Sequence, residues 1–182
     1  MRRAVFLDRD GTLIREVGYL SRLEDLEVLP GVAGALRRLG ESGFVRLVVT
    51  NQSGVARGYF GEDFVEQTHR ELLRRLQTEG ASVEGFYVCP HHPEHSGPCG
   101  CRKPKDGLVR RAAGEWGLDL GASWVVGDKA ADVALARVAG CRAALVRTGY
   151  GAETETELAG QGRAADVVAD DLEHAVEEIL AS

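Results

Sequence analysis

Long apolar runs and an excess of basic residues are both missing from this sequence. No stretch of its 182 residues approaches the roughly 18 consecutive apolar residues that a membrane-spanning helix needs. The apolar stretch before Asp8 is too short for the core of a signal peptide, so we expect a cytoplasmic protein with no membrane partner. Acidic residues outnumber basic ones by 28 to 22, and this balance argues against a general nucleic-acid binder.

Short apolar runs alternate with helical patterns along the whole chain. The runs predict strands at residues 5–7, 45–49, 86–88, 124–126 and 143–146. Apolar spacings of three and four predict helices at residues 31–41, 61–79, 105–116, 130–139 and 172–180. Unbroken apolar strands between helices are typical of a parallel sheet covered on both faces, so we expect a Rossmann-like α/β fold. With no linker and no internal repeat, residues 1–182 are expected to form one domain.

The first predicted strand runs directly into Asp8-Arg9-Asp10-Gly11-Thr12. Side chains two residues apart in an extended chain point to the same side, so the two aspartates present their carboxylates together. Adjacent carboxylates repel unless a cation or a shared proton compensates, and Mg²⁺ prefers such oxygen ligands. Taken alone, the segment also fits an ordinary turn after a strand, because Asp and Gly favour turns.

Polar side chains also stand at other strand and helix ends. Thr50 and Asn51 end the second strand, where a hydroxyl and backbone N–H groups can seat a phosphoryl oxygen. Arg102 and Lys103 precede a predicted helix, whose start attracts anions, and Asp128 follows the fourth strand. Each piece has a purely structural alternative: a polar loop, a solvated basic pair, a capping aspartate. Ligands of an open parallel sheet bind beyond the carboxyl ends of its strands, so these side chains are expected to share one edge.

Three of the four cysteines lie in one loop, residues 89–101, together with three histidines. The candidate metal ligands are Cys89, Cys99 and Cys101 with one of His91, His92 and His95. Three thiolates and one imidazole form a closed ligand set for structural Zn²⁺, with no position left for a catalytic water. A reduced, metal-free loop is the alternative, and composition alone does not distinguish the three histidines.

In this order, the Asp-x-Asp-Gly-Thr segment, Thr50, Lys103 and the acidic segment at Asp128 resemble the haloacid dehalogenase superfamily of phosphatases. The resemblance implies that Asp8 is the nucleophile and forms an aspartyl phosphate. It implies that Asp10 first protonates the leaving oxygen and then acts as base on water. Thr50 and Lys103 would hold the phosphoryl oxygens. Mg²⁺ would bind Asp8, the backbone carbonyl of Asp10, and Asp128.

Within the superfamily, the zinc loop and the absence of a large cap insertion are similar to one subgroup. It contains the D-glycero-D-manno-heptose 1,7-bisphosphate 7-phosphatases and the histidinol-phosphate phosphatase domain. The pattern of this subgroup selects His91 as the fourth zinc ligand. It implies an enzyme that hydrolyses the 7-phosphate of a phosphorylated sugar, the heptose bisphosphate, and yields heptose 1-phosphate for nucleotide-activated heptose synthesis. We expect the protein to be a monomer. The alternatives are a histidinol-phosphate phosphatase and a non-catalytic, zinc-clamped binding module.

If the heptose resemblance holds, several side chains are candidates for recognising the sugar or its second phosphate. They are the segment from Glu16 to Tyr19, which includes Gly18, together with Arg57 and Arg102. Arg102 is favoured for the second phosphate because a guanidinium binds phosphate through two parallel hydrogen bonds. Lys129 would contact either the substrate or the acidic cluster. Packing of the first loop and surface solvation are the structural alternatives for Tyr19 and Arg57.

Overall fold

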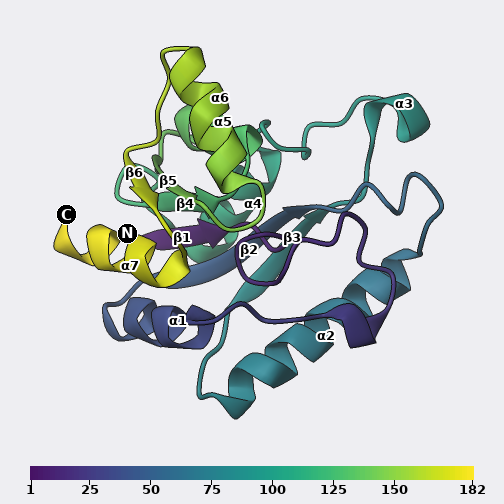
Figure 1. Ribbon diagram of the computed structural model, residues 1–182, viewed down its shortest axis with the longest axis horizontal. Coiled ribbons are helices and arrows are strands. Elements are labelled where there is room, and N and C mark those ends of the chain that lie inside the picture. Colours follow the sequence, from purple (N-terminus) through teal and green to yellow (C-terminus); the bar gives the residue numbers. More distant parts are fainter.

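The computed structural model describes all residues from Met1 to Ser182. Six strands, all parallel, form one sheet with helices on both of its faces (Figure 1). The strands are β1 (Ala4–Leu7), β2 (Val45–Asn51), β3 (Gly85–Cys89), β4 (Trp124–Gly127), β5 (Arg142–Val146) and β6 (Val167–Ala169), in the order β3-β2-β1-β4-β5-β6. The predicted α/β class with a parallel sheet is confirmed.

The helices cover the sheet in two groups. They are α1 (Val32–Glu41), α2 (Glu62–Thr78), α3 (Pro93–Ser96), α4 (Gly107–Trp116), α5 (Ala130–Ala139), α6 (Gly151–Gly160) and α7 (Leu172–Ala181), with a 3-10 turn η1 (Leu23–Asp25). The sequence predicted five of these helices and five strands but missed α3, α6, β6 and η1. Three of these elements have four residues or fewer, and the buried positions of α6 are Gly151, Thr154 and Leu158, so none carries an apolar period. None of the helices is long and apolar enough to cross a membrane.

Successive side chains of β1 serve two different cores. Val5 and Leu7 pack in a core that includes residues of α1, α2 and α7. Ala4 and Phe6 pack in a second core with residues of α4, α5 and α6. All four side chains are fully buried, as expected for a central parallel strand with helices on both faces.

The direction of chain progression changes at β1, and this change places the functional edge. From β1 the chain continues to β2 and β3 on one side, and then crosses to β4, β5 and β6 on the other. Such a switch leaves a crevice at the carboxyl ends of the central strands. Asp8 follows β1, Thr50 lies near the end of β2, and Asp128 follows β4, so all three reach that edge as predicted.

The segment between β1 and α1 folds back over the same edge. Asp10 and Ile14 form an isolated bridge, and Ile14 pairs in antiparallel fashion with Val28. Leu20 and Leu26 are buried and belong to the core shared with α1 and α2. The segment is thereby anchored by its apolar side chains, while its polar residues remain free to face the edge.

Candidate active site

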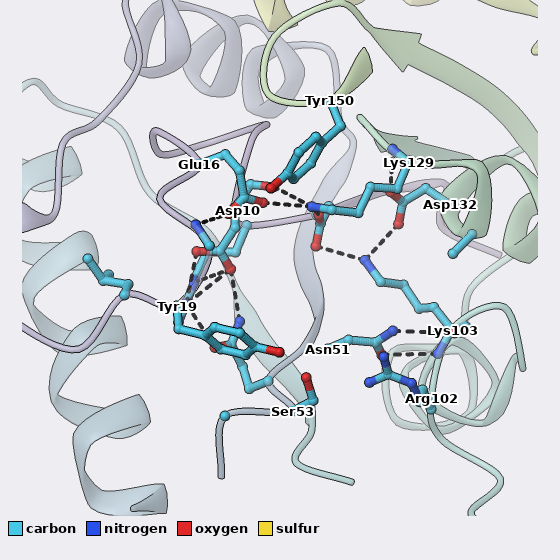
Figure 2. A pocket seen from close by; sticks show the side chains of 17 residues that line it. Asp10, Glu16, Tyr19, Asn51, Ser53, Arg102, Lys103, Lys129, Asp132 and Tyr150 are labelled. Carbon is cyan, nitrogen blue, oxygen red and sulfur yellow. Dashed lines mark hydrogen bonds and ion pairs between the residues drawn. The ribbon is translucent and has the colours of Figure 1, made fainter. Parts of the chain in front are cut away.

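A cavity of about 360 Å³ lies at the carboxyl edge of the sheet (Figure 2). The predicted site residues that line it are Asp8, Asp10, Gly18, Tyr19, Asn51, Arg102, Lys103 and Lys129. Thr50 and Asp128 are buried at the same edge, within hydrogen-bond reach of lining residues. In Figure 2, Lys103 and Lys129 point inward, whereas Tyr19 and Tyr150 stand at the cavity wall. The structure therefore brings together residues from four separate parts of the sequence.

Lys103 lies between two carboxylates at the floor of the cavity. Its Nζ is 2.7 Å from Asp8 Oδ1 and 2.7 Å from Asp132 Oδ1, and it donates to the carbonyl of Val49 at 2.9 Å. Burial opposes the charge of Lys103, but the Asp132 and Asp8 carboxylates outweigh it and raise the pKa of the ammonium group. Burial likewise opposes ionisation of Asp8, and Lys103 and Lys129 outweigh it and lower the pKa of the Asp8 carboxyl. Asp8 is therefore held as a carboxylate, the form a nucleophile requires.

Asp132 was not among the predicted site residues, although it holds the lysine from the opposite side. It stands in the first turn of α5, where an aspartate is ordinarily a helix cap, and its Oδ2 does accept the backbone N–H of Lys129 at 3.1 Å. The second oxygen reaches Lys103, and only the tertiary structure shows that contact. Burial raises the pKa of Asp132, while Lys103 acts in the opposite direction.

The ammonium of Lys129 occupies a cation position that is surrounded by oxygen atoms. Its Nζ is 2.9 Å from Glu16 Oε2, 3.3 Å from Asp128 Oδ1, 3.4 Å from the backbone carbonyl of Asp10 and 3.8 Å from Asp8 Oδ2. Burial and the neighbouring Asp8 carboxylate raise the pKa of Asp128 to about 7, so its charge depends on a nearby cation. Two carboxylates and a carbonyl oxygen around one such position are a donor set that fits Mg²⁺.

Two glycines allow the backbone to approach Asp128 closely. A Cβ atom at Gly11 or at Gly149 would overlap the Asp128 carboxylate, and both glycines have positive φ angles, 87° and 59°. The backbone N–H of Tyr150 donates to Asp128 Oδ2 at 2.9 Å. The acidic group is thus enclosed by backbone atoms, and a side chain at either glycine would displace it.

Asp10 is held by a hydrogen-bond network that the sequence did not predict. Arg9 donates through Nε to Asp10 Oδ2 and through Nη2 to Oδ1, both at 3.1 Å. Gln52 Nε2 donates to Asp10 Oδ2 at 2.9 Å and to Thr50 Oγ1 at 2.8 Å. Strand alternation would direct Arg9 away from its two acidic neighbours, so spacing contained no signal for this contact.

The Cys/His loop brings four candidate ligands together. Cys89 Sγ lies 3.7 Å from Cys99 Sγ and 3.1 Å from Cys101 Sγ, and His91 Nδ1 lies 3.3 Å from Cys101 Sγ. A tetrahedral site with Zn–S bonds of 2.3 Å has sulfur atoms about 3.8 Å apart. The Cys89–Cys99 separation is close to that value, whereas the Cys89–Cys101 separation is shorter. No disulfide is formed. The donor set fits a structural Zn²⁺.

The structure separates the three histidines of the loop. His91 joins the thiols, whereas His92 and His95 lie near Glu94 in a second group. Arg57 contacts this second group, with Nη2 at 2.9 Å from His92 Nε2 and Nη1 at 3.2 Å from His95 Nε2. Arg57 therefore does not line the cavity.

A protein-family model and several named enzymes match this chain in sequence. Residues 100–175 match the family described as HAD-hydrolase-like. The chain is 44% identical to the D-glycero-D-manno-heptose-1,7-bisphosphate 7-phosphatase of Thermosynechococcus vestitus, over 98% of this chain and 95% of the relative. The chain belongs to the heptose-bisphosphate phosphatase family. Another member, from Haemophilus ducreyi, is 41% identical over 86% of this chain and 89% of its own.

Solved structures in the family share the whole architecture. The D,D-heptose 1,7-bisphosphate phosphatase from B. bronchiseptica, solved with magnesium and phosphate, matches with a TM-score of 0.89 and 34% identity, over 98% of both chains. The corresponding enzyme from Burkholderia thailandensis matches with a TM-score of 0.74 and 28% identity, over the full length of both chains. The resemblance to haloacid dehalogenase phosphatases is confirmed, and the chain is an enzyme of the phosphatase class.

Proposed function

We propose that the protein removes the 7-phosphate of D-glycero-D-manno-heptose 1,7-bisphosphate and releases heptose 1-phosphate for nucleotide-activated heptose synthesis. The observation that carries this proposal is the convergence of Asp8, Asp10, Lys103 and Asp128 on one cavity, in a chain whose relatives bear that enzyme name. A volume of about 360 Å³ falls within the range of about 300–1,000 Å³ usual for small-molecule sites. We propose that the 182 residues act as one cytoplasmic, monomeric phosphatase domain.

In the first half of the reaction, a carboxylate oxygen of Asp8 attacks phosphorus while the bond from phosphorus to the sugar oxygen breaks. The departing oxygen takes a proton from Asp10, and an aspartyl phosphate remains on Asp8. Lys103 lies against Asp8 and would hold a phosphoryl oxygen, and the Thr50 hydroxyl would hold another. Positive charge at this position stabilises the charge that develops on the transferred group.

In the second half, water attacks the phosphorus of the aspartyl phosphate and gives its proton to the Asp10 carboxylate. The bond between phosphorus and the Asp8 oxygen breaks, so inorganic phosphate leaves and both aspartates return to their starting forms. Asp8, the Asp10 carbonyl and Asp128 would hold Mg²⁺, which would supply the positive charge that an anionic nucleophile needs to approach an anionic phosphate. The balance is one ester and one water consumed, one alcohol and one phosphate formed.

The zinc loop would act indirectly, by holding the phosphate-binding residues in place. Arg102 Nη1 donates to the backbone carbonyl of the zinc-ligand candidate His91 at 3.1 Å. Asn51 receives the backbone N–H of Lys103 on its Oδ1 at 3.0 Å. These contacts join the loop to the end of β2. Zn²⁺ bound by Cys89 and its partners would stabilise a segment with little apolar core of its own.

The test compares the purified protein with its Asp8→Asn variant in Mg²⁺, with phosphate release followed from heptose 1,7-bisphosphate and from histidinol phosphate. We expect a strong preference for the heptose bisphosphate and loss of activity in the variant, while Asp25→Asn, an exposed aspartate of η1, keeps it. A preference for histidinol phosphate would keep the mechanism and replace the substrate. Release from neither ester would favour the zinc-clamped binding module.

A further inference from the structure

Arg9 is a buried arginine that lies between Asp8 and Asp10, the two candidate catalytic residues, in the sequence. Its side chain is only 2% exposed. Removing a guanidinium from water is costly unless most of its N–H groups find partners, so its retention at this position requires specific contacts. Two of those contacts go to the Asp10 carboxylate, through Nε and Nη2 at 3.1 Å each. This is the two-pronged geometry by which a guanidinium fixes the plane of a carboxylate.

The remaining contacts of the Arg9 guanidinium are with residues from two other parts of the fold, the end of β2 and α2. Nη2 also donates to Gln52 Oε1 at 2.9 Å, just beyond the end of β2. Nη1 lies 3.4 Å from Nε2 of His69, a buried residue of α2 whose ring stacks on Phe86 with a centroid separation of 4.2 Å. Burial and the charge of Arg9 lower the pKa of His69 to about 3, so the ring is neutral and can accept that N–H.

The two carboxylate oxygens of Asp10 accept different numbers of hydrogen bonds. Oδ2 receives Arg9 Nε and Gln52 Nε2, and Nη2 of Arg9 lies 3.0 Å away. Oδ1 receives a single donor, Arg9 Nη2. A carboxyl oxygen has two lone pairs, so Oδ1 is the oxygen with a position left to carry a proton. Gln52 Nε2, which donates to this carboxyl, also donates to the Thr50 hydroxyl.

From this geometry we propose that Arg9 is a positioning residue for the acid–base cycle of Asp10. It turns Oδ1 toward the leaving oxygen, and its charge stabilises the carboxylate that remains when the proton has moved to that oxygen. The P–O bond to the leaving group breaks as the proton is transferred, and the proton returns from water in the second half-reaction. This inference rests on the proposed function, because it needs a phosphate ester whose leaving group requires protonation.

Leaving-group dependence tests the inference directly. The comparison is kcat/KM for heptose 1,7-bisphosphate, whose sugar oxygen needs a proton, and for p-nitrophenyl phosphate, whose leaving group does not. This quantity reports only the steps up to departure of the leaving group. In Arg9→Met we expect kcat/KM for the sugar ester to fall roughly hundredfold, in line with the usual contribution of general acid catalysis, and that for the aryl ester less than tenfold. Arg9→Lys keeps the positive charge but loses the paired N–H groups, so its kcat/KM for the sugar ester should lie between the values of the wild type and Arg9→Met.

A double mutant separates positioning from structural damage. In an Asp10→Asn background, Arg9→Met should cause no further change in the ratio of the two kcat/KM values, because the group that it positions is already gone. The matched control is Arg46→Met, a half-buried arginine paired with Glu84 outside the cavity, which should leave the ratio unchanged. Equal losses on both esters in Arg9→Met would show a merely structural role and overturn the inference.

Other outcomes distinguish failure of this inference from failure of the proposed function. If Arg9→Met does not fold, the same comparison of kcat/KM values is made with Arg9→Lys and with Gln52→Met, because Gln52 donates to the same carboxyl. Unchanged ratios in both variants would also overturn the inference. Wild-type protein that releases phosphate from neither ester would overturn the proposed function itself. A shifted ratio in Asp10→Asn without one in the Arg9 variants would leave the proposed function standing and remove only the role of Arg9.

Discussion

Charge balance at the level of single residues explains why the cavity needs a cation. Three buried carboxylates, Asp8, Asp128 and Asp132, face two ammonium groups, Lys103 and Lys129. Burial and, after it, this excess of negative charge raise the pKa of Asp128, so its carboxyl group resists ionisation. A bound Mg²⁺ would remove that excess and free the site to accept an anionic substrate.

Arg102 is the residue best placed to select a substrate with two phosphates. It lines the cavity next to Lys103, and a guanidinium forms charge-assisted hydrogen bonds to phosphate worth about 1.5–3 kcal/mol. In Arg102→Ala we expect kcat/KM for heptose 1,7-bisphosphate to fall roughly ten- to hundredfold, with a much smaller loss on p-nitrophenyl phosphate. Arg110→Ala, on the exposed side of α4, is the control. Equal losses on both substrates would contradict a role in binding the second phosphate.

At the level of elements, the Cys/His loop, residues 89–101, is hydrogen-bonded to the end of β2 and to the segment that follows it. The backbone N–H of Gln52 donates to the carbonyl of Cys89 at 2.8 Å, and that of Ala56 donates to the carbonyl of Pro90 at 3.2 Å. Lys103 follows Cys101 by two residues and is fixed through Asn51. Distortion of the loop is therefore expected to reach Lys103.

We predict that Cys99→Ser lowers both the zinc content and the turnover of the protein. A displacement of about 1 Å in a group that binds the reacting phosphate can cost about a hundredfold in rate, and we expect a loss of that order. Zinc content by elemental analysis and kcat with saturating Mg²⁺ provide the two measurements. Cys141→Ser alters a cysteine outside the loop and should keep full zinc content. Full activity in a zinc-free variant would contradict the structural role of the loop.

The buried side chain of His69 in α2 makes the stability of the fold dependent on pH. His69 has a folded-state pKa of about 3 because of burial and Arg9, against an unfolded value of about 6.5. Below pH 6.5 the unfolded chain takes up a proton that the folded protein refuses, so stability is full above that pH and falls as the pH drops toward 3. Between pH 7 and pH 5 this one group should cost about 2 kcal/mol of the free energy of unfolding.

His69→Phe, which keeps a ring to stack on Phe86, should remove that contribution. Urea denaturation at pH 7 and pH 5 measures the loss for each protein, and the variant should lose about 2 kcal/mol less than the wild type. Glu62 and Glu66, which line the small cavity beside His69, are present in both proteins, so the comparison isolates the change at His69. His174→Gln removes an exposed histidine whose pKa is raised by Asp171, so it should not reduce the acid loss.

Across the whole molecule, the cavity is assembled from segments that are far apart in the chain. Lys103 and Asp8 are separated by 95 positions, and Thr148 Oγ1 donates to the Gly11 carbonyl over 137 positions. Ligands that bridge these segments bind only the folded protein, so they stabilise the fold as a whole.

We therefore expect Mg²⁺ and inorganic phosphate together to raise the melting temperature. At concentrations about 100 times the dissociation constant, binding adds about 2.7 kcal/mol. For a chain of this length that corresponds to a rise of about 5–10 °C in Tm. Either ligand alone should have a smaller effect, because each provides the charge that the other needs. Differential scanning fluorimetry measures the shift, and Asp128→Asn should lose the part that depends on Mg²⁺.

The sequence by itself predicted five of the six parallel strands and the placement of Asp8, Asp10, Thr50 and Asp128 at strand ends, because apolar runs, helical periodicity and strand ends are local properties. The clustered cysteines likewise indicated a metal loop. Only the tertiary structure decided which histidine joins the thiols, that Arg57 faces His92 and His95, that Asp132 contacts Lys103 and that Arg9 contacts Asp10. A long side chain can reach any of several partners, and the partner that it finds depends on how distant segments pack.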